Sequence, residues 1–276
     1  MYEQLSMFDI VLEQPKQEDI YNMKGGESDV LAALPLSENS NLCPYKIPTV
    51  DEIAKLIEKS AYGTDKTRLL SNVLECGAIS ISNAVDKSQS KEREKRYSEI
   101  INAYKESDRK SLCEIFARIF ALCSSVVYDN GAFSDNLGEL FMRLDQGNKH
   151  TGQFFTPYHI SKFMAECALL EDYVKEKTAN DGIITICDPC SGGGGMMIAA
   201  LSTLKEYGVN YARNCFVECS DIDIRCVHMT YIQLALAGVP AIVKHQNSLS
   251  RELWSVWRTP ALIFQYTRFC QYEKYN

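Results

Sequence analysis

The segment Asp188-Pro189-Cys190-Ser191-Gly192-Gly193-Gly194-Gly195 decides the fold, because one apolar run leads into it and another leads out. The run from Gly182 to Cys187 fits a buried parallel strand, and the run from Met196 to Leu204 propagates readily as a helix. Four glycines between them make a turn whose main chain a cofactor can approach. The sequence therefore predicts a strand, a glycine-rich turn and a helix. Several classes of nucleotide-binding protein use such a turn, so its neighbours must discriminate among them.

Three further segments surround this turn in a fixed order. Upstream lies Thr151-Gly152-Gln153-Phe154-Phe155-Thr156-Pro157; downstream come Cys215 to Asp223, an apolar strand that ends in acids, and then His245-Gln246-Asn247-Ser248-Leu249. The set resembles the adenine-specific N6 DNA methyltransferases related to the modification subunits of type I restriction-modification systems, of bacterial or prophage type. In that family G-[EQ]-[FY]-[FY]-T-P precedes D-P-x-x-G-x-G-G. The resemblance covers residues 135–249.

The resemblance implies a fold, a cofactor and a function. The fold is α/β, a Rossmann-like S-adenosylmethionine-dependent methyltransferase domain, here preceded by a mainly helical region. The cofactor is S-adenosyl-L-methionine, and the function is N6-specific methylation of adenine in DNA, of the restriction-modification type. The cofactor-binding residues that it implies are Phe154, Phe155, Thr156, Pro157, Asp188, Pro189, Gly192, Gly194, Asp221 and Asn247.

The polar residues of this set have chemistry that suits those roles. Asp188 closes the first strand, where it can hold turn amides or the cofactor's amino group, and Pro189 stiffens the exit. Asp221 ends the second strand, where a carboxylate can accept hydrogen bonds from ribose hydroxyls, with Asp223 as a second candidate. Asn247 stands where the family usually has an Asp that reads the adenine, and an amide can both donate and accept there. Alternatively, Asp221 caps the helix that follows.

The remaining members of the set are glycines and aromatic residues. Gly192 and Gly194 match the two critical glycines of the family, while Gly193 stands where the family usually has Ser. Phe154 and Phe155 would pack on the adenosyl or methionyl part of the cofactor. The alternative reading of these two phenylalanines is that they are ordinary core aromatics.

The catalytic loop of the family has no counterpart in this sequence. In the family, an [Asn/Asp/Ser]-Pro-Pro-[Tyr/Phe] loop after the fourth strand holds the amino group of the flipped adenine and stacks on the base. The chain contains no Pro-Pro pair, and after Asn247 only Thr259-Pro260 remotely resembles this loop. The catalytic residues are therefore unknown. The chain also stops where a full methyltransferase sheet would still need its remaining strands, so we expect an incomplete sheet. Because positioning of the base accounts for much of such a rate, we expect methyl transfer by this chain alone to be absent or very slow.

This absence keeps two other functions open. One is a catalytically silent S-adenosylmethionine-binding module, acting as a regulatory or partner subunit associated with DNA. The other is a methyltransferase for protein or a small molecule, which the Gly152 to Pro157 segment disfavours because that segment is typical of the DNA enzymes. A specificity or catalytic partner subunit is an expected partner in either DNA-associated case.

Composition predicts a folded, cytoplasmic protein. The 276 residues are 46% hydrophobic, and neither a signal peptide nor an apolar run of membrane-spanning length is present. Eleven cysteines read as free thiols in a reducing compartment. Cys187-x-x-Cys190 and Cys215-x-x-x-Cys219 have spacings that zinc sites use, and Pro189-Cys190 is similar to the nucleophile of cytosine C5 methyltransferases, but their place in a buried strand and a turn favours neither. We predict no metal.

The net charge of −7 argues against binding duplex DNA through a broad positive field, so any DNA contact must be local or come from a partner. The densest basic segment, Lys87 to Arg96, is interleaved with acids and predicts a solvated helix face. Near the N-terminus, Gln4, Leu5, Met7 and Phe8 resemble the peptide by which bacterial proteins dock into the sliding clamp; a locally packed or disordered terminus is the alternative.

Three regions follow from the distribution of turn-forming and apolar residues. Residues 1–48 form a lead rich in Pro and Gly, residues 49–150 a mainly helical region, and residues 151–276 the Rossmann-like domain. Thr49 is the predicted cap of the first helix.

Overall fold

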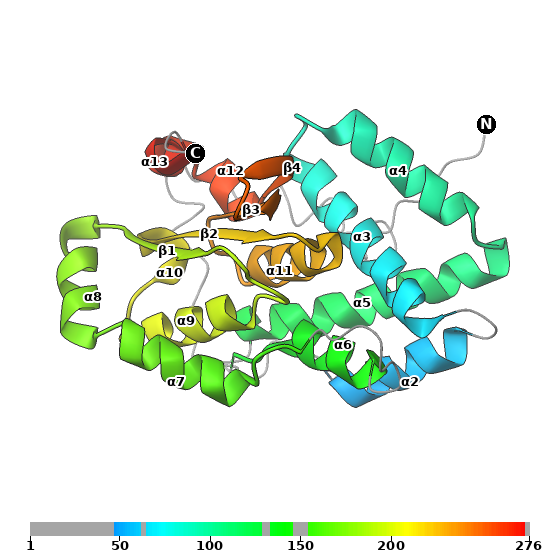
Figure 1. Ribbon diagram of the computed structural model, residues 1–276, viewed down its shortest axis with the longest axis horizontal. Coiled ribbons are helices and arrows are strands. Elements are labelled where there is room, and N and C mark those ends of the chain that lie inside the picture. The colour runs from blue at the N-terminus through cyan, green and yellow to red at the C-terminus, as the bar shows by residue number, and fades with distance from the viewer. Residues whose placement is uncertain (1–46, 62–64, 129–132, 146–153, 274–276) are drawn as a thin grey trace, which may run out of the picture.

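The computed structural model describes residues 47–61, 65–128, 133–145 and 154–273, which form a helical region followed by a sheet with helices on both faces (Figure 1). The helices before the sheet are α2 (Val50–Ser60), α3 (Lys66–Val85), α4 (Ser90–Asn102), α5 (Glu106–Tyr128), α6 (Asn136–Asp145), α7 (Tyr158–Ala168) and α8 (Glu171–Thr178), followed by the 3-10 turn η1 (Ala179–Asp181). The strands and the remaining helices are β1 (Ile184–Asp188), α9 (Gly195–Glu206), α10 (Tyr211–Asn214), β2 (Cys215–Asp221), α11 (Ile224–Leu236), β3 (Ala241–Asn247), β4 (Glu252–Arg258), α12 (Pro260–Phe264) and α13 (Tyr266–Glu273).

The first described helix begins where its cap predicts. The Thr49 side chain accepts a hydrogen bond from the Glu52 amide, and the Glu52 side chain accepts one from the Thr49 amide. This reciprocal capping box satisfies two amides that a helix start would otherwise leave without partners. The predicted cap at Thr49 is confirmed.

The sheet has four strands in the order β1-β2-β3-β4. β1 pairs parallel with β2 and β2 parallel with β3, with α9 and α11 as the crossovers, whereas β4 pairs antiparallel with β3. Parallel strands joined by helices are the Rossmann-like arrangement. The predicted α/β fold is therefore confirmed, and β1, the strand that leads into the glycine turn, lies at one edge of the described sheet.

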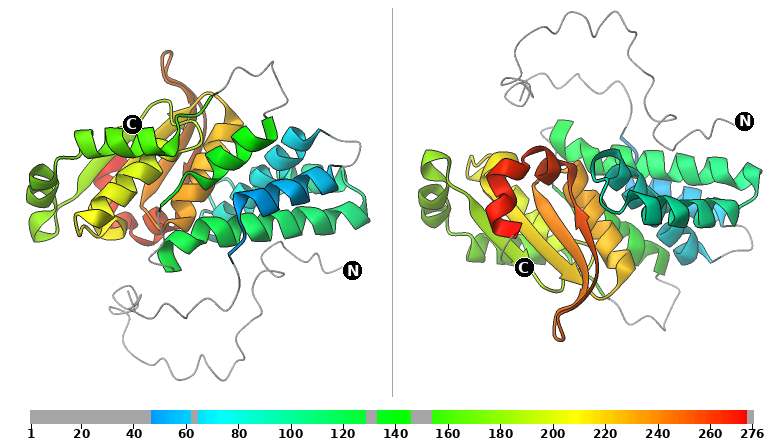
Figure 2. Two further views of the ribbon diagram at one scale, coloured as in Figure 1. Left: turned by 90° about the horizontal axis from the view of Figure 1, so that it is seen from below. Right: turned by 90° about the horizontal axis from the view of Figure 1, so that it is seen from above.

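The two faces of the sheet carry different layers. Helices α9 and α11 lie on one face, and α12 and α13 lie on the other, as the two views of Figure 2 show. On the first face α11 is buried from Cys226 to Leu234, because helices α3 and α5 cover its outer side. On the second face Phe216 and Ile242 of the sheet pack with Leu262 and Phe269 of the two C-terminal helices. β1 is only partly covered because it is an edge strand of the described sheet: Thr185 and Cys187 are exposed, so the predicted burial of this strand is wrong at these two positions.

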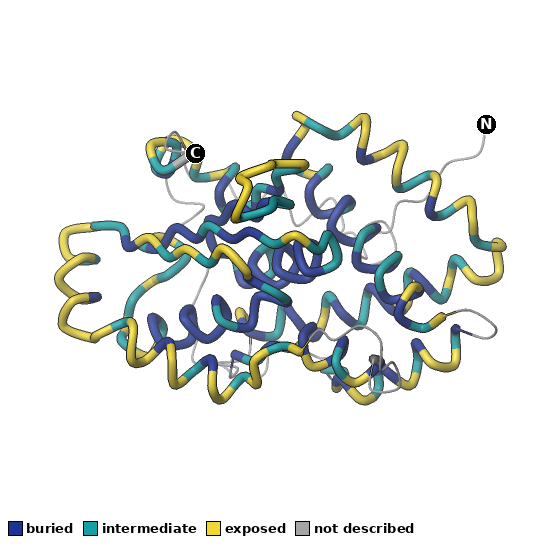
Figure 3. The backbone as a smooth tube through the Cα atoms, in the orientation of Figure 1, coloured by how far each residue is buried: buried dark blue, intermediate teal, exposed yellow. Residues whose placement is uncertain are grey.

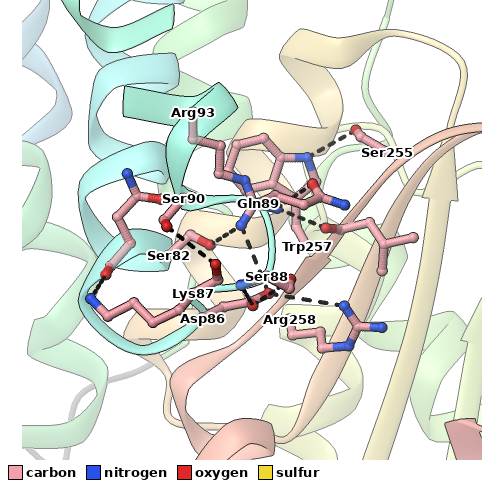
Figure 4. A network of polar contacts seen from close by, with 12 residues as sticks. Ser82, Asp86, Lys87, Ser88, Gln89, Ser90, Arg93, Ser255, Trp257 and Arg258 are labelled. Carbon is pink, nitrogen blue, oxygen red and sulfur yellow. Dashed lines mark hydrogen bonds and ion pairs between the residues drawn. The ribbon is translucent and has the colours of Figure 1, made fainter. Parts of the chain in front are cut away.

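The helical region is joined to the sheet at β4 through a buried arginine (Figure 4). The guanidinium of Arg93 lies 4.1 Å from the centre of the Trp257 ring and donates hydrogen bonds to the Val256 carbonyl at 2.8 Å and to the Ser82 hydroxyl at 2.5 Å. The carboxylate of Asp86 lies 3.8 Å from it. A buried charge needs such partners. The prediction of a solvated face for residues 87–96 is therefore wrong at Arg93, which is 5% exposed.

One hydrophobic core extends across both regions. Its buried members include residues of α2, α3 and α5 together with residues of α9, α11 and the three parallel strands. Exposure is concentrated on the outer sides of α4, α7 and α8 (Figure 3). None of the helices in the described residues is both long and apolar enough to cross a membrane.

Candidate cofactor-binding site

The candidate site lies where the carboxyl ends of β1 and β2 meet the glycine turn. The registers place Asp188 opposite Cys219 and Asp221 opposite His245, so the acids that end β1 and β2 lie at the same edge of the sheet. The amide of Ser191 donates to the Ser220 carbonyl at 3.0 Å and ties the turn to β2. In sheets of this type, ligands bind at this edge.

Asp188 holds the first part of the turn. Its Oδ1 accepts a hydrogen bond from the Cys190 amide at 3.0 Å, and the Pro189 carbonyl between them accepts one from the Ser220 hydroxyl at 3.2 Å. The expectation that Asp188 can hold turn amides agrees with this contact, while the contact with a cofactor that the resemblance implies stays a prediction.

Two glycines of the turn adopt backbone conformations that other residues rarely take. The φ angle is +53° at Gly192 and +92° at Gly194. A Cβ atom on Gly194 would lie 3.1 Å from the Thr230 hydroxyl oxygen, and one on Gly192 would lie 3.1 Å from the Phe155 ring. A side chain at either position is therefore opposed both by the backbone angle and by the lack of room.

The space beside these glycines is filled by the protein's own side chains. At Gly195, too, a Cβ atom would come within 2.4 Å of the Asp135 carboxylate. Three of the four glycines therefore make room for Phe155, Thr230 and Asp135, while the approach of a cofactor to the main chain of the turn stays a prediction. Gly193 differs, because a Cβ there would meet its nearest neighbour, the Gly138 Cα, at 3.4 Å, an ordinary contact distance.

Asp221 binds the turn from the side of β2. Its Oδ2 accepts from the Gly192 amide at 2.8 Å, and its Oδ1 accepts from the Asp223 amide at 2.8 Å. Burial raises the pKa of Asp221, although both amides act in the opposite direction. The carboxylate thus links the glycine turn to the start of α11, and each oxygen keeps lone pairs that can accept from a ligand.

The cap of α11 is Asp223, not Asp221. The Asp223 carboxylate accepts from the Arg225 amide at 2.9 Å and pairs with the Arg225 guanidinium. Although burial opposes it, this pairing keeps the pKa of Asp223 below its usual value. The sequence-based alternative that Asp221 caps the helix is therefore wrong, and Asp223 is already engaged as the cap.

The aromatic segment before α7 lies partly against the turn. Phe155 packs on Phe141, with ring centres 5.3 Å apart, and beside Gly192. Phe154 is 83% exposed, Thr156 is also exposed, and Pro157 caps α7 without a side-chain hydrogen bond. Residues 151–153, including Gly152 and Gln153 of the motif, lie outside the described residues.

Asn247 ends β3 and shapes the turn that follows. Its Oδ1 accepts hydrogen bonds from the Leu249 amide at 3.0 Å and from the Ser250 amide at 3.2 Å. This is an Asx-type turn, and it leaves the carboxamide nitrogen available as a donor to a ligand. Reading of the adenine by Asn247 stays a prediction.

Thr259-Pro260, the pair that remotely resembles the catalytic loop, lies at the end of the sheet opposite the glycine turn. β4 runs antiparallel to β3, and Ile242, near the start of β3, pairs with Arg258 at the end of β4. Thr259 is fully buried; its hydroxyl accepts from the Ala241 amide at 2.9 Å and donates to the Val239 carbonyl at 2.7 Å. These two residues therefore close the sheet opposite the glycine turn and cannot hold a base beside it.

The cysteines lie as thiols in or near the strands. Cys215 and Cys219 are buried, and Cys187 and Cys190 are exposed. Burial raises the pKa of Cys219 well above its usual value, which disfavours the thiolate that zinc binding requires. Within the described part of the chain no group of three or more His, Cys, Asp or Glu could hold a metal ion.

Three residues at the turn were missed by the sequence analysis. Thr230 and Gln233, one helical turn apart on α11, bond to carbonyls of the turn, and Asp135 lies behind them. Burial raises the pKa of Asp135, against the effect of the hydrogen bonds that it accepts. The threonine and glutamine sit among apolar residues of a helix, and polar residues on a buried helix were the signal that could have found them.

Comparisons with known proteins find a family that this part of the chain resembles. Residues 132–266 match the family model described as N-6 DNA Methylase. A comparison with curated proteins gives no match. Among solved structures, the chain is similar to a type I restriction-modification system methyltransferase subunit from Streptococcus thermophilus, with 18% identity and a TM-score of 0.39, over 76% of this chain and 42% of that one. It is also similar to a protein from Listeria monocytogenes assigned as a class I S-adenosylmethionine-dependent methyltransferase, with 14% identity and a TM-score of 0.35, over 72% of this chain and 54% of that one. The chain thus spans about half the length of these structures.

Proposed function

Since residues 132–266 match the family model described as N-6 DNA Methylase, we propose that this chain binds S-adenosyl-L-methionine and works as an adenine-specific N6 DNA methyltransferase of the restriction-modification type. The family match supports the cofactor and the kind of reaction. A partner subunit that supplies specificity or completes the acceptor site is part of the proposal, because the sequence has no Pro-Pro loop.

The observation that carries the proposal is the joint placement of the glycine turn and Asp221. The Gly192 amide donates to Asp221 at 2.8 Å, across 29 residues of sequence, so the turn after β1 and the acid after β2 form one rim at the carboxyl end of the strands. A ligand with a hydroxylated sugar and a charged amino-acid end needs both a carboxylate acceptor and main-chain donors. At this rim the carboxylate of Asp221 lies next to the main chain of the glycine turn, joined to it by the hydrogen bond from the Gly192 amide.

The predicted binding residues divide according to the part of the cofactor that they suit. Asp221 would accept from the ribose hydroxyls, and Asn247 would reach the adenine with its free amide nitrogen. The exposed ring of Phe154 is available to pack on the adenosyl or methionyl part. Asp188 would meet the cofactor's amino group while keeping the Cys190 amide as its second partner.

Calorimetric titration with S-adenosylmethionine and its demethylated product tests the first half of the proposal. We expect heat of binding with both ligands from a folded protein, as judged by circular dichroism and a cooperative melt. If the folded chain gives no heat with either ligand, the assignment of the cofactor is wrong.

Methyl transfer to unmethylated DNA of mixed sequence tests the second half. N6-methyladenine in the digested DNA is measured by mass spectrometry, with the Gly194→Leu variant as a control that lacks the cofactor. We expect slow or undetectable transfer by the isolated chain and faster transfer once a partner subunit is supplied. Modified cytosine, or methyl transfer to protein only, would contradict the proposed substrate.

A second candidate function is a silent S-adenosylmethionine-binding subunit associated with DNA. The observation that favours it is the position of Thr259-Pro260 at the opposite end of the sheet from the glycine turn, with Thr259 fully buried. Cofactor binding without N6-methyladenine under every subunit combination would support this candidate over the enzyme. Robust N6-methyladenine formation by the purified chain would exclude it.

The sliding clamp is proposed as a further partner through Gln4, Leu5, Met7 and Phe8, which lie outside the described residues. Such a short peptide would depend on one or two apolar anchors. The double variant Leu5→Ala/Phe8→Ala is expected to lose binding to immobilised clamp without a change in melting temperature, whereas the matched variant Val11→Ala/Leu12→Ala keeps it. A large loss of stability in the first variant would contradict the clamp proposal.

A further inference from the structure

We propose that Thr230 and Gln233 are positioning residues for the cofactor, because together they hold two successive carbonyls of the glycine turn from behind and so fix the direction of its amides. This inference rests on the proposed function, since it concerns the same site. Neither residue would touch the cofactor, and both act through the main chain of Gly192 and Gly193.

The first contact is made by Thr230. Its hydroxyl donates to the Gly192 carbonyl at 2.9 Å, and the side chain is fully buried. The peptide between Gly192 and Gly193 is trans, as are the other peptides of the described residues. In a trans peptide the carbonyl and the following N–H point in opposite directions. With the Gly192 carbonyl held on α11, the Gly193 N–H must therefore point away from α11.

This amide is the donor that the turn leaves for a ligand. Within the described residues, the neighbouring turn amides are engaged: Ser191 donates to Ser220, Gly192 to Asp221, and Gly194 to the Ser191 carbonyl at 2.8 Å. The Gly193 N–H donates to no acceptor of the described chain. A main-chain donor at the start of α9, where the helix dipole is positive, suits the carboxylate of the methionyl part.

The second contact is made by Gln233, one turn of α11 further on. Its Nε2 donates to the Gly193 carbonyl at 2.7 Å and to Asp135 Oδ1 at 2.8 Å, which uses both of its N–H bonds. Asp135 Oδ1 also accepts from the Gly138 amide at 3.0 Å. Asp135 thereby orients the carboxamide so that its nitrogen, not its oxygen, faces the turn.

The side chains around the turn leave it little freedom to relax. Because the Asp135 carboxylate occupies the place of a Cβ on Gly195, and Thr230 lies 3.1 Å from that on Gly194, the rear of the turn is packed against Asp135 and α11. Removing one hydrogen bond would leave a buried carbonyl without a partner and would favour rotation of its peptide toward water. Such rotation would also turn the Gly193 N–H out of the site.

The test uses matched substitutions at Thr230. Thr230→Val keeps the shape and removes the hydroxyl, whereas Thr230→Ser keeps the hydroxyl. Calorimetric titration with S-adenosylmethionine is expected to show an approximately tenfold weaker affinity for the valine variant and a change of less than about threefold for the serine variant. Gln233→Met, which removes both donors, is expected to weaken binding at least as much as Thr230→Val.

Thr259→Val is the matched control for a merely structural effect. Thr259 is also fully buried, and its hydroxyl also donates to a backbone carbonyl, but at the other end of the sheet. We expect this variant to lower the melting temperature about as much as Thr230→Val and to leave the cofactor affinity within twofold. Equal weakening by both valine variants, or no weakening by Thr230→Val, would overturn the proposal.

Amide hydrogen exchange in the ligand-free protein separates this inference from the proposed function. In Thr230→Val, exchange across a peptide containing residues 188–195 is expected to be at least tenfold faster than in Thr259→Val. If the unmodified protein fails to bind S-adenosylmethionine, the proposed function falls, whereas the exchange rates still report whether Thr230 holds the turn. Unchanged exchange in a protein that binds the cofactor would overturn the positioning role alone.

Discussion

The carboxyl end of the parallel strands holds a glycine turn through hydrogen bonds from several side chains to its main chain, whereas the amino end on the α12 side combines the hydrogen bonds of Thr259 with a cluster of apolar side chains. At the first end Asp188, Asp221 and Thr230 each hold a backbone group of the glycine turn. At the second end Phe216 stacks with Phe269, with ring centres 6.1 Å apart. Directional contacts preserve a backbone shape for a ligand, while non-directional packing mainly stabilises the fold. Ligand binding and stability should therefore respond separately to substitutions at the two ends.

The largest effect is expected from a side chain at Gly194. Gly194→Leu forces a branched side chain into a residue with φ +92° and a Cβ position 3.2 Å from the Thr230 backbone, so the turn must change shape. We expect calorimetry to show no binding of S-adenosylmethionine. Gly193→Ser, one residue away with no positive φ and a Cβ position at ordinary contact distance from its neighbours, is the control and should bind within a few fold of the unmodified protein. Retained binding by Gly194→Leu would show that cofactor binding does not depend on the shape of the glycine turn.

Truncation of Phe269 tests the opposite end. Phe269 is fully buried, and Phe269→Ala removes a ring from the cluster under α12 and α13. We expect a loss of about 4 kcal/mol in the free energy of unfolding, measured by urea denaturation. The affinity of the remaining folded protein for the cofactor should be unchanged. A weaker affinity with intact stability would show that the two ends are coupled.

His228 lies between the two ends of the strands, where α11 packs against β4, and its protonation is expected to lower the stability of the fold. His228 is fully buried, its ring centre lies 5.0 Å from that of Trp257, and burial lowers its pKa from 6.5 to about 4. Because the unfolded chain binds the proton more tightly, the stabilising contribution is fully present above pH 6.5 and is lost as the pH falls toward 4. The expected loss is at most about 3 kcal/mol.

The variant His228→Phe keeps an aromatic ring against Trp257 and removes the titration. Urea denaturation at several pH values should give a flatter stability profile between pH 6.5 and 4 for this variant than for the unmodified protein. Identical profiles would show that the acid sensitivity comes from other groups.

The smallest effect is expected at Pro260. This residue is the first of α12, where proline has no amide hydrogen bond to lose, and it lies at the end remote from the turn. Pro260→Ala should change the free energy of unfolding by less than about 1 kcal/mol and should leave both cofactor binding and any N6-methyladenine formation unchanged. Loss of methyl transfer with intact cofactor binding would instead place the acceptor site at Thr259-Pro260.

Much of the local structure could be predicted from short stretches of sequence. The strand before the glycine turn, the helix after it and the strand from Cys215 to Asp221 lie where apolar runs predicted them. The capping box at Thr49 is likewise local. The predictions that failed concern the neighbours and the exposure of a side chain in the folded protein. Arg93 was expected in solvent, but its guanidinium lies over the ring of Trp257, 164 residues further along the chain.

The sequence alone predicts the order of strand, turn and helix, the acids that end β1 and β2, and the similarity to the N6 methyltransferases, because caps, turns and apolar periodicity act over a few residues. Tertiary packing was needed to show that Thr230 and Gln233 support the turn and that Thr259-Pro260 lies at the opposite end. Gln233 meets Asp135 across 98 residues, and the antiparallel direction of β4 reverses the end at which its last residues lie. Such contacts depend on how elements pack, which no local spacing specifies.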